Sequence, residues 1–194
     1  MNRGYESFEV RLTGVAPLLM HNVRKLADPM SDISRAKKRL TLKKTAKTDD
    51  DMMELQRLDM VGSLYLGADG KLTIPGENID AMICDMAKKY KKGKLIKSSV
   101  FCTTLEFSFA GEQDPEKLVL DPKHRFFSMV RIKMARQMSV RPIFRSWSLK
   151  FRVDYLPGDL NREDIESFIK EAGLLVGLGD WRPRYGTFTT EILG

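Results

Sequence analysis

A glycine-rich segment near the C-terminus carries two kinds of side chain that hold single-stranded nucleic acid. Guanidinium groups pair with phosphates, and aromatic rings stack on bases. Glycines let such a segment turn tightly and approach a ligand closely. The segment contains Gly177, Gly179, Trp181, Arg182, Arg184, Tyr185 and Gly186. We predict that it forms part of a nucleic-acid site. The alternative is a structural connection between a helix and a strand, with Trp181 buried.

The basic residues of the chain are concentrated in a few stretches. The net charge is +7, yet the stretch between Asp121 and Asp154 holds nine Lys and Arg residues and no acid. Two further runs, 35–47 and 88–97, hold seven and six basic residues and again no acid. Such clustering is the electrostatic footprint of a protein that binds a polyanion. Within the acid-free stretch we predict base stacking by Phe144 and phosphate contacts by Arg131, Lys133, Arg141, Arg145, Lys150 and Arg152.

No pattern in the sequence indicates a metal or cofactor site. His21 and His124 lack partner residues at the spacing of zinc ligands. Residues 67–73 contain a Gly-Lys pair, but the spacing differs from that of a phosphate-binding loop. The two cysteines form no C-x-x-C pair, and no apolar stretch reaches the length of a membrane span. We therefore expect a cytoplasmic protein with no cofactor, no metal and no membrane partner.

Hydrophobic periodicity predicts the elements that position these residues. Alternating apolar residues predict strands at 7–13, 100–109, 147–155 and 187–193. Helical spacing predicts helices at 50–61, from 75 to the lysines before Gly93, and from a cap at Asn161 or Asp159 to 176. Residues 64–74 resemble a hairpin, 126–134 and 137–144 resemble the arms of another, and 24–48 fit either a helix or a mobile loop. The predicted apolar faces are Ile79, Met82, Ile83 and Met86; Leu105, Phe107 and Phe109; and Ile165, Phe168, Ile169, Ala172 and Leu175.

The order of these elements predicts the fold class. Apart from two long insertions, the order is strand, helix, strand, strand, helix, strand. This order predicts an α+β protein with a ferredoxin-like (RRM-like) antiparallel sheet and two helices on one face. We expect one domain over 1–194, with a basic segment, helix and hairpin inserted at 22–74 and a basic insertion at 110–146. The uncovered sheet face binds single-stranded RNA in RRM domains.

Four motifs follow one another along nearly the whole chain. They are the Pro-Leu turn at 14–19, the pair Asp28-Pro29, the helix start Ile74-Pro75-Gly76 and the glycine-rich segment 177–186. This ordered set resembles the RAMP superfamily of CRISPR-associated proteins, specifically the RNA-binding backbone subunits of crRNA-guided effector complexes. The chain is also similar to small stand-alone, phage-encoded relatives of those subunits.

The resemblance implies a modified RRM-like core with a thumb-like hairpin at 110–146. It implies subunits that assemble head-to-tail along RNA into a filament, with other effector-complex subunits as further partners. In the family, the Ile-Pro-Gly helix start and the glycine-rich segment face the RNA backbone, which suits the positive end of a helix. The residues Glu77, Asp80 and Asp85 depart from the family pattern, which is more basic in this helix.

We expect a non-enzymatic protein that binds single-stranded nucleic acid, prefers RNA and oligomerises along it. The alternative is an endoribonuclease. His21 follows the first strand and would serve as the general base of a metal-independent cleavage. The resemblance places Asp28 where type III-like relatives carry the aspartate that cleaves target RNA. A scaffold protein whose basic runs only keep it in solution is a third interpretation, and the sequence leaves RNA and single-stranded DNA both open.

Overall fold

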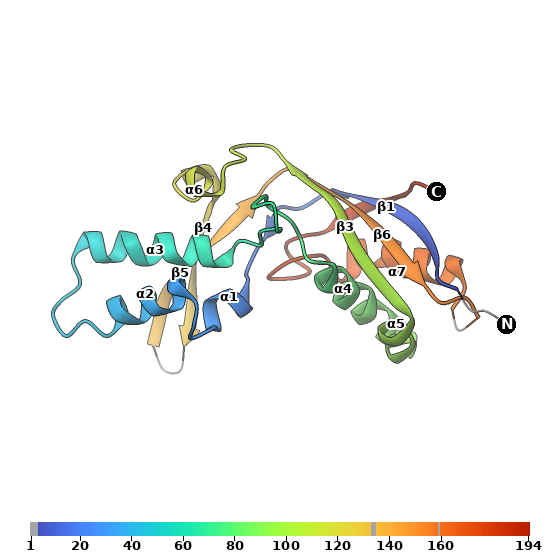
Figure 1. The fold of residues 1–194 in the computed structure, drawn as a ribbon, viewed down its shortest axis with the longest axis horizontal. Helices are drawn as coiled ribbons and strands as arrows, with labels where there is room; N and C mark the ends of the chain where they lie inside the picture. The colour runs from blue at the N-terminus through green and yellow to red at the C-terminus, as the bar shows by residue number, and fades with distance from the viewer. Residues whose placement is uncertain (1–3, 133–134, 159) are drawn as a thin grey trace. The chain divides into compact units, whose positions relative to one another are not determined.

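The computed structural model describes residues 4–132, 135–158 and 160–194 (Figure 1). The chain divides into two compact units. The sheet unit consists of the described residues up to Leu19, of Thr73–Ala110 and of Phe144–Gly194. The hairpin unit consists of Met20–Leu72 and the described residues of Gly111–Ile143. Helices and antiparallel strands both contribute, so the protein belongs to the α+β class.

Four antiparallel strands form the sheet of the sheet unit. In spatial order they are β3 (Val100–Phe109), β6 (Trp147–Tyr155), β1 (Glu6–Gly14) and β7 (Phe188–Ile192). Val10 of β1 lies opposite Phe151 of β6, and both are buried, whereas their neighbours Arg11 and Arg152 are exposed. One face of the sheet is therefore apolar and forms half of a core. The predicted bounds of β3 and β6 are confirmed.

The helices α4 (Gly76–Lys88) and α7 (Arg162–Leu175) pack side by side against this sheet, and the short α5 (Gly93–Ser99) follows α4 (Figure 1). The predicted apolar faces of α4 and α7 are buried, apart from Leu175, which is 51% exposed. The prediction was wrong for Leu175 because α7 ends at this residue. Gly76 begins α4 close to β3, where a Cβ would overlap the carbonyl oxygen of Cys102.

An irregularity in β3 changes which side chains share a face. The pairing of β3 with β6 shifts between Thr104 and Glu106, which is the register change of a β-bulge. Leu105 lies in this bulge and is 45% exposed. Phe107 and Phe109 pack against the Phe144 ring, with ring centroids 5.5 and 4.8 Å away. The prediction that Leu105 shares their side was therefore wrong, because the extra residue breaks the alternation.

The hairpin unit contains the remaining helices and one β-hairpin. Its elements are α1 (Val23–Ala27), α2 (Asp32–Thr41), α3 (Asp49–Ser63), α6 (Pro115–Leu118), a 3₁₀ helix (Pro122–His124), β4 (Arg125–Ile132) and β5 (Ala135–Phe144), and the short strand β2 (Leu18–Leu19) precedes it. β4 and β5 pair antiparallel, as the sequence predicted for the second hairpin. Much of the segment 24–48 is helical. The hairpin predicted at 64–74 is reduced to a single bridge between Leu66 and Leu72.

The two predicted insertions belong to the same unit. The sequence analysis placed them at 22–74 and 110–146 within one domain. The structure gathers residues 20–72 and 111–143 into the hairpin unit, which has buried side chains of its own such as Leu58 and Leu118. Within the part of the chain that the structure describes, no helix has both the length and the apolar character needed to cross a membrane.

Candidate nucleic-acid interface

The glycine-rich segment connects α7 to β7 and is held against the turn that follows β1. The backbone N–H of Asp180 donates to the Leu19 carbonyl at 2.9 Å, and that of Gly186 donates to the Pro17 carbonyl at 2.8 Å. Leu178 N–H closes the segment on itself by donating to the Gly186 carbonyl at 2.8 Å. The Pro-Leu turn and the glycine-rich segment, two of the four sequence motifs, therefore form one structural element.

The glycines of the segment are required by its own packing. Gly177, Gly179 and Gly186 have φ values of 74°, 82° and 74°, which side chains rarely adopt. A Cβ at Gly186 would overlap the Leu178 carbonyl oxygen. The structure shows that these glycines allow close approach of the chain to itself, and close approach to a ligand stays a prediction.

The two aromatic residues of the segment are available at the surface. Trp181 is 39% exposed, and Tyr185 is half-buried with its ring edge-on to Trp181 at a centroid distance of 6.4 Å. The interpretation that Trp181 is a buried structural residue is therefore wrong. Phe144, the third predicted stacking residue, is fully buried in the sheet unit and has no exposed ring face to stack on a base.

The two arginines of the segment differ in their surroundings. Arg182 Nη2 lies 3.4 Å from Asp85 Oδ2 on α4. The same carboxylate receives Lys88 Nζ at 2.7 Å. Arg184 is exposed, and no described residue forms an ion pair with it. Arg184 can therefore bind a phosphate without breaking an ion pair, whereas Arg182 must first break its ion pair with Asp85.

The sheet face opposite the helices has its charges paired. Its cations lie beside carboxylates on the same or neighbouring strands, in the pairs Arg11–Glu191 (3.0 Å), Lys150–Glu9 (2.7 Å) and Arg152–Asp154 (3.1 Å). Exposed ion pairs of this kind contribute about 0–1 kcal/mol each, so a polyanion can displace them at modest cost. Lys150 and Arg152 would nevertheless have to exchange partners to contact phosphate. This face is a weaker polyanion site than the sequence analysis expected.

The predicted contacts in and beside the hairpin fall into three groups. Arg141 is buried, with only 8% of its surface exposed, and does not present its guanidinium to a strand in this conformation. Arg145 is exposed on the connection to β6. Arg131 belongs to β4, but its side chain lies outside the described part of the structure, and Lys133 lies wholly outside it.

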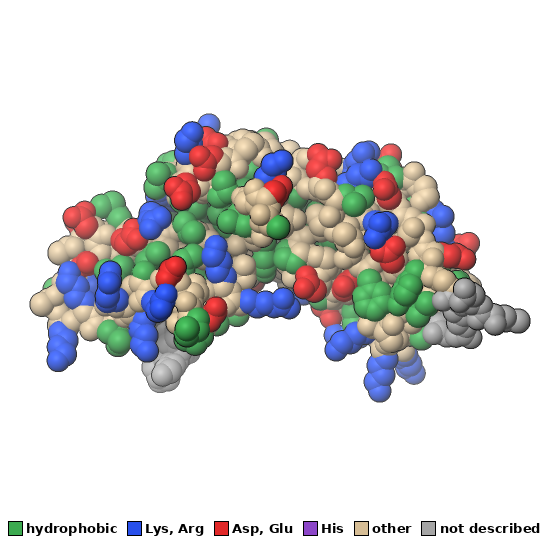
Figure 2. Space-filling view, in the orientation of Figure 1, with side chains coloured by type: hydrophobic (Ala, Val, Ile, Leu, Met, Phe, Trp, Pro, Cys, Tyr) green, Lys and Arg blue, Asp and Glu red, His purple; other side chains and the backbone are tan. Residues whose placement is uncertain are grey.

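Two groups of exposed lysines and arginines have no ion-pair partner among the described residues. Figure 2 shows Lys and Arg side chains gathered over α2 in the hairpin unit and over α5 in the sheet unit. The sequence analysis identified both basic runs but assigned none of their residues to a site. We call them the α2 cluster (Lys38, Arg39, Lys44 and Lys47) and the α5 cluster (Lys89, Lys91, Lys94 and Lys97).

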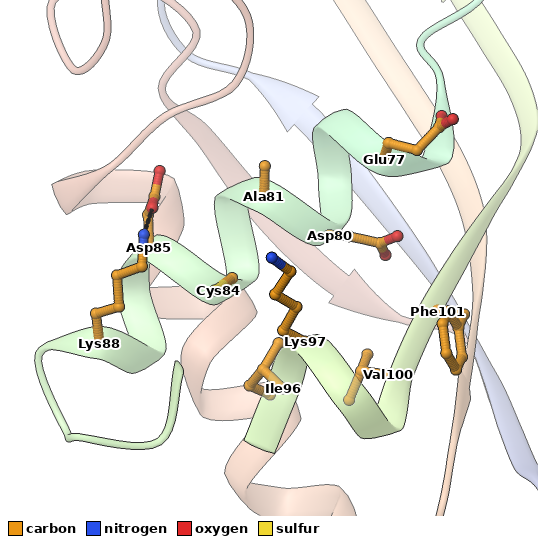
Figure 3. Close-up of a pocket in the computed structure, with 10 residues that line it drawn as sticks. All are labelled: Glu77, Asp80, Ala81, Cys84, Asp85, Lys88, Ile96, Lys97, Val100 and Phe101. Atoms are coloured by element: carbon orange, nitrogen blue, oxygen red, sulfur yellow. Dashed lines mark hydrogen bonds and ion pairs between the residues drawn. The ribbon is translucent and has the colours of Figure 1, made fainter. Parts of the chain in front are cut away.

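A pocket of about 470 Å³ lies between α4, α5 and the start of β3 (Figure 3). Asp80 of α4 lines it, and its Oδ1 accepts a hydrogen bond from the Cys102 N–H at 2.8 Å. Burial raises the pKa of Asp80, and burial also raises the pKa of the Cys102 thiol well above its usual value. Cys102 is therefore a protonated, unreactive thiol. The sequence analysis missed this pocket, and an acidic residue beside the apolar stripe of α4 was the only signal for it.

The proposed catalytic residues both belong to the hairpin unit. Asp28 follows α1, and its Oδ1 accepts a hydrogen bond from the Met30 N–H at 2.9 Å. This is the geometry of an aspartate that stabilises a turn. His21 is half-buried, and its backbone carbonyl accepts a hydrogen bond from the Tyr65 hydroxyl at 2.9 Å. Catalytic roles for the two residues stay predictions, and the contact of Asp28 is that of a structural residue.

The arrangement of the described side chains suits binding of a polyanion and of an aromatic base. Among these residues, no group of three or more His, Cys, Asp and Glu side chains is placed to hold a metal ion. The assignment of the site depends on this chemistry, because no protein-family model and no curated protein sequence matches the chain.

Proposed function

We propose that the protein binds single-stranded nucleic acid, prefers RNA, and acts without catalysis. One observation carries this proposal: exposed cations that form no ion pair with any described residue belong to the same unit as an exposed aromatic residue. In the sheet unit these are the α5 cluster, Arg184 and Trp181. Cations neutralise phosphates and release counterions, and aromatic rings stack on unpaired bases, so the combination favours a single strand over a duplex.

The arrangement of the sheet unit supports a ferredoxin-like (RRM-like) core. The strand order β3-β6-β1-β7, with α4 after β1 and α7 after β6, is the order expected for a split βαβ sheet. The resemblance to RAMP backbone subunits supports RNA as the preferred ligand and head-to-tail assembly along it. In such an assembly, several copies would bind one strand, so the number of bound copies would increase with strand length.

Fluorescence anisotropy of labelled single-stranded RNA of about 30 nucleotides, with matched DNA, tests the proposal over a salt series. We expect affinity to fall steeply with salt and to be higher for RNA. Replacing Lys89, Lys91 and Lys94 by Ala should lower the salt slope by about 2, since each phosphate contact on a single strand contributes about 0.7. Arg184→Ala should lower it by about 0.7.

Two lysines that already form ion pairs provide the matched control. Lys170 pairs with Glu166 at 3.6 Å, and Lys117 pairs with Asp114 at 3.9 Å. Their replacement by Ala removes two positive charges, compared with three in the variant of Lys89, Lys91 and Lys94, but we expect the salt slope to stay as in the unmodified protein. Equal changes per charge removed in both sets would show that net charge alone drives binding. No binding at about 150 mM salt would contradict the proposal.

The same incubations distinguish binding from cleavage. RNA recovered from the anisotropy samples and separated on a denaturing gel should be intact. Fragments that disappear with His21→Ala or Asp28→Ala would support the endoribonuclease alternative instead. Stoichiometry on strands of increasing length, measured by light scattering, tests oligomerisation: a single bound copy on every strand would contradict assembly along the ligand.

A further inference from the structure

The pocket between α4, α5 and β3 holds a carboxylate and an ammonium group that do not pair with each other. Asp80 projects from α4, and Lys97 extends from α5 towards α4 (Figure 3). Neither side chain forms an ion pair with any described residue. Asp80 is half-buried, and a partly buried charge without an ion-pair partner loses solvation without full compensation, whereas Lys97 is exposed. An acceptor and a donor that line one pocket without pairing leave both groups able to bind a ligand.

The rest of the lining is mixed, with charged side chains (Glu77, Asp85 and Lys88) beside apolar or aromatic ones (Ala81, Cys84, Ile96, Val100 and Phe101). Ile96 and Val100 are buried, whereas Phe101 at the start of β3 is 45% exposed and stands at the side of the pocket (Figure 3). The Phe101 ring lies edge-on to Tyr5, with centroids 6.0 Å apart. The volume of about 470 Å³ is within the range of small-molecule sites, about 300–1,000 Å³. A flat aromatic ligand with polar edges fits this combination of walls.

We propose that this pocket holds a guanine base. Asp80 accepts hydrogen bonds from the N1–H and the N2 amino group, and the Lys97 ammonium donates to O6. Phe101 provides the face for stacking. Guanine presents two adjacent donors beside an acceptor on its Watson–Crick edge, which matches a carboxylate beside an ammonium group.

The other bases match these walls less well. Adenine and cytosine each present one amino donor next to a ring nitrogen that is an acceptor, and this lone pair would face the Asp80 carboxylate. Uracil presents one N–H between two carbonyl acceptors. With each of these bases, a polar group of the pocket either faces a group that repels it or has no partner, which lowers the affinity about tenfold or more. The Watson–Crick edge is used for recognition, so the base must be unpaired, as it is in a single strand.

The guanine can belong to a bound strand or to a free nucleotide, and both present the same base edge. The first case rests on the proposed function. Arg182 connects the pocket to the glycine-rich segment, because its partner Asp85 also lines the pocket. A base in the pocket would therefore belong to a strand that continues past Arg182 and Trp181. The second case is independent of strand binding.

Isothermal titration of the full-length protein with GMP, AMP, CMP, UMP and inorganic phosphate tests the proposal. We expect GMP to bind at least about tenfold more tightly than the other nucleotides, and phosphate alone not to compete. Asp80→Asn, which keeps the size of the side chain and the acceptor for the Cys102 N–H, should weaken GMP binding about tenfold or more. Lys97→Ala should weaken it as well. Asp164→Asn, on α7 outside the pocket lining, is the matched control and should leave GMP affinity unchanged.

Anisotropy with an oligouridylate that contains one central guanosine separates the two sources. Tighter binding than to the all-uridine strand, lost in Asp80→Asn, identifies the base of a strand. GMP binding without an effect of the strand guanosine identifies the free nucleotide. Equal affinity for all four nucleotides, or unchanged GMP affinity in Asp80→Asn, overturns the proposal. Binding of arginine methyl ester in place of GMP also overturns it, since the occupant would then be a basic side chain.

The experiments distinguish failure of the guanine pocket from failure of the proposed strand binding. Strand binding that is salt-dependent but insensitive to guanosine, with no GMP binding, overturns the guanine pocket and leaves strand binding intact. GMP binding with no affinity for any strand contradicts the proposed function and leaves the pocket intact.

Discussion

Arg182 of the glycine-rich segment lies 3.4 Å from Asp85 of α4, measured from Nη2 to Oδ2. The other oxygen of the same carboxylate lies 2.7 Å from Lys88 Nζ, three residues further along the helix. Two cations therefore share one carboxylate at the edge of the pocket. Asp85 competes with any phosphate for the Arg182 guanidinium, and only the folded chain creates this competition.

Asp85→Asn is expected to strengthen the binding of single-stranded RNA by about two- to fivefold. The pair is partly exposed, and such pairs contribute at most about 1 kcal/mol, which corresponds to about fivefold in affinity. Anisotropy at a fixed salt concentration measures the change. Glu163→Gln, which removes the same charge from an exposed residue that forms no ion pair with any described residue, is the control. An equal gain from both variants would mean that net charge, and not the release of Arg182, sets the affinity.

Gly186→Ala is expected to destabilise the protein more than Gly70→Ala. Both glycines have nearly the same conformation, with φ of 74° and 77°, and this conformation alone costs about 1–2 kcal/mol for alanine. A Cβ at Gly70 meets no atom, whereas one at Gly186 overlaps the Leu178 carbonyl. We expect an additional loss of about 1–3 kcal/mol at Gly186. Urea unfolding followed by circular dichroism measures both, and similar losses would show that the Leu178 backbone moves aside at no cost.

Local patterns in the sequence were sufficient for most elements of the sheet unit. The alternation of β3 and β6 gave their bounds. Of the two predicted caps of α7, Asn161 precedes the helix and Asp159 lies outside the described residues. The predictions for Leu105 and Leu175 were wrong because the fold, and not the local sequence pattern, decides where these side chains lie. The bulge at Leu105 depends on pairing with β6, and the exposure of Leu175 depends on where α7 ends. Neither follows from periodicity.

The candidate site was predictable in composition but not in geometry. The basic runs and the Trp/Arg/Tyr segment are visible in the sequence, and the exposure of Trp181 agrees with the binding interpretation. The pairing of Arg182 with Asp85 and of Lys150 with Glu9 joins distant parts of the chain, so the sequence could not show which cations are already neutralised. The pocket at Asp80 depends on three elements that come together only in the fold.

The start of α3 is expected to lose its cap as the pH falls from about 4 to about 2. Asp51 completes a capping box with Thr48, and hydrogen bonds from Lys43 and Thr48 lower the pKa of Asp51 to about 2. A carboxyl with a lowered pKa stabilises the folded state above its unfolded value of about 3.8, and this stabilisation disappears as pH falls through the folded value.

Amide hydrogen exchange at the first turn of α3 measures this loss. Protection should decrease over this pH range in the unmodified protein. In Asp51→Asn, protection should be lower at neutral pH and should depend less on pH. Asp50→Asn, on a neighbouring residue outside the capping box, should retain the pH dependence of the unmodified protein. If Asp51→Asn loses protection over the same pH range as the unmodified protein, a group other than Asp51 causes the acid transition.

Asp80→Asn is expected to stabilise the free protein at pH 7. Burial raises the pKa of Asp80 and the nearby Glu77 raises it further, while hydrogen bonds from Cys102 oppose the rise. A carboxyl whose pKa is higher in the folded state favours folding in its protonated form, so its contribution is present below the unfolded pKa and is lost as pH rises through the folded pKa. Asparagine is neutral throughout and keeps an oxygen for the Cys102 N–H.

Thermal unfolding at two pH values measures this effect. The Tm of Asp80→Asn should exceed that of the unmodified protein at pH 7, and the difference should shrink near about pH 3, where Asp80 is protonated as well. A carboxylate that costs stability in the free protein, and whose removal weakens GMP binding, is retained for its ligand rather than for the fold. If Asp80→Asn instead lowers Tm at pH 7, the carboxylate stabilises the α4–β3 contact. Asp80 would then be retained for the fold, and its effect on stability would give no support to the guanine pocket.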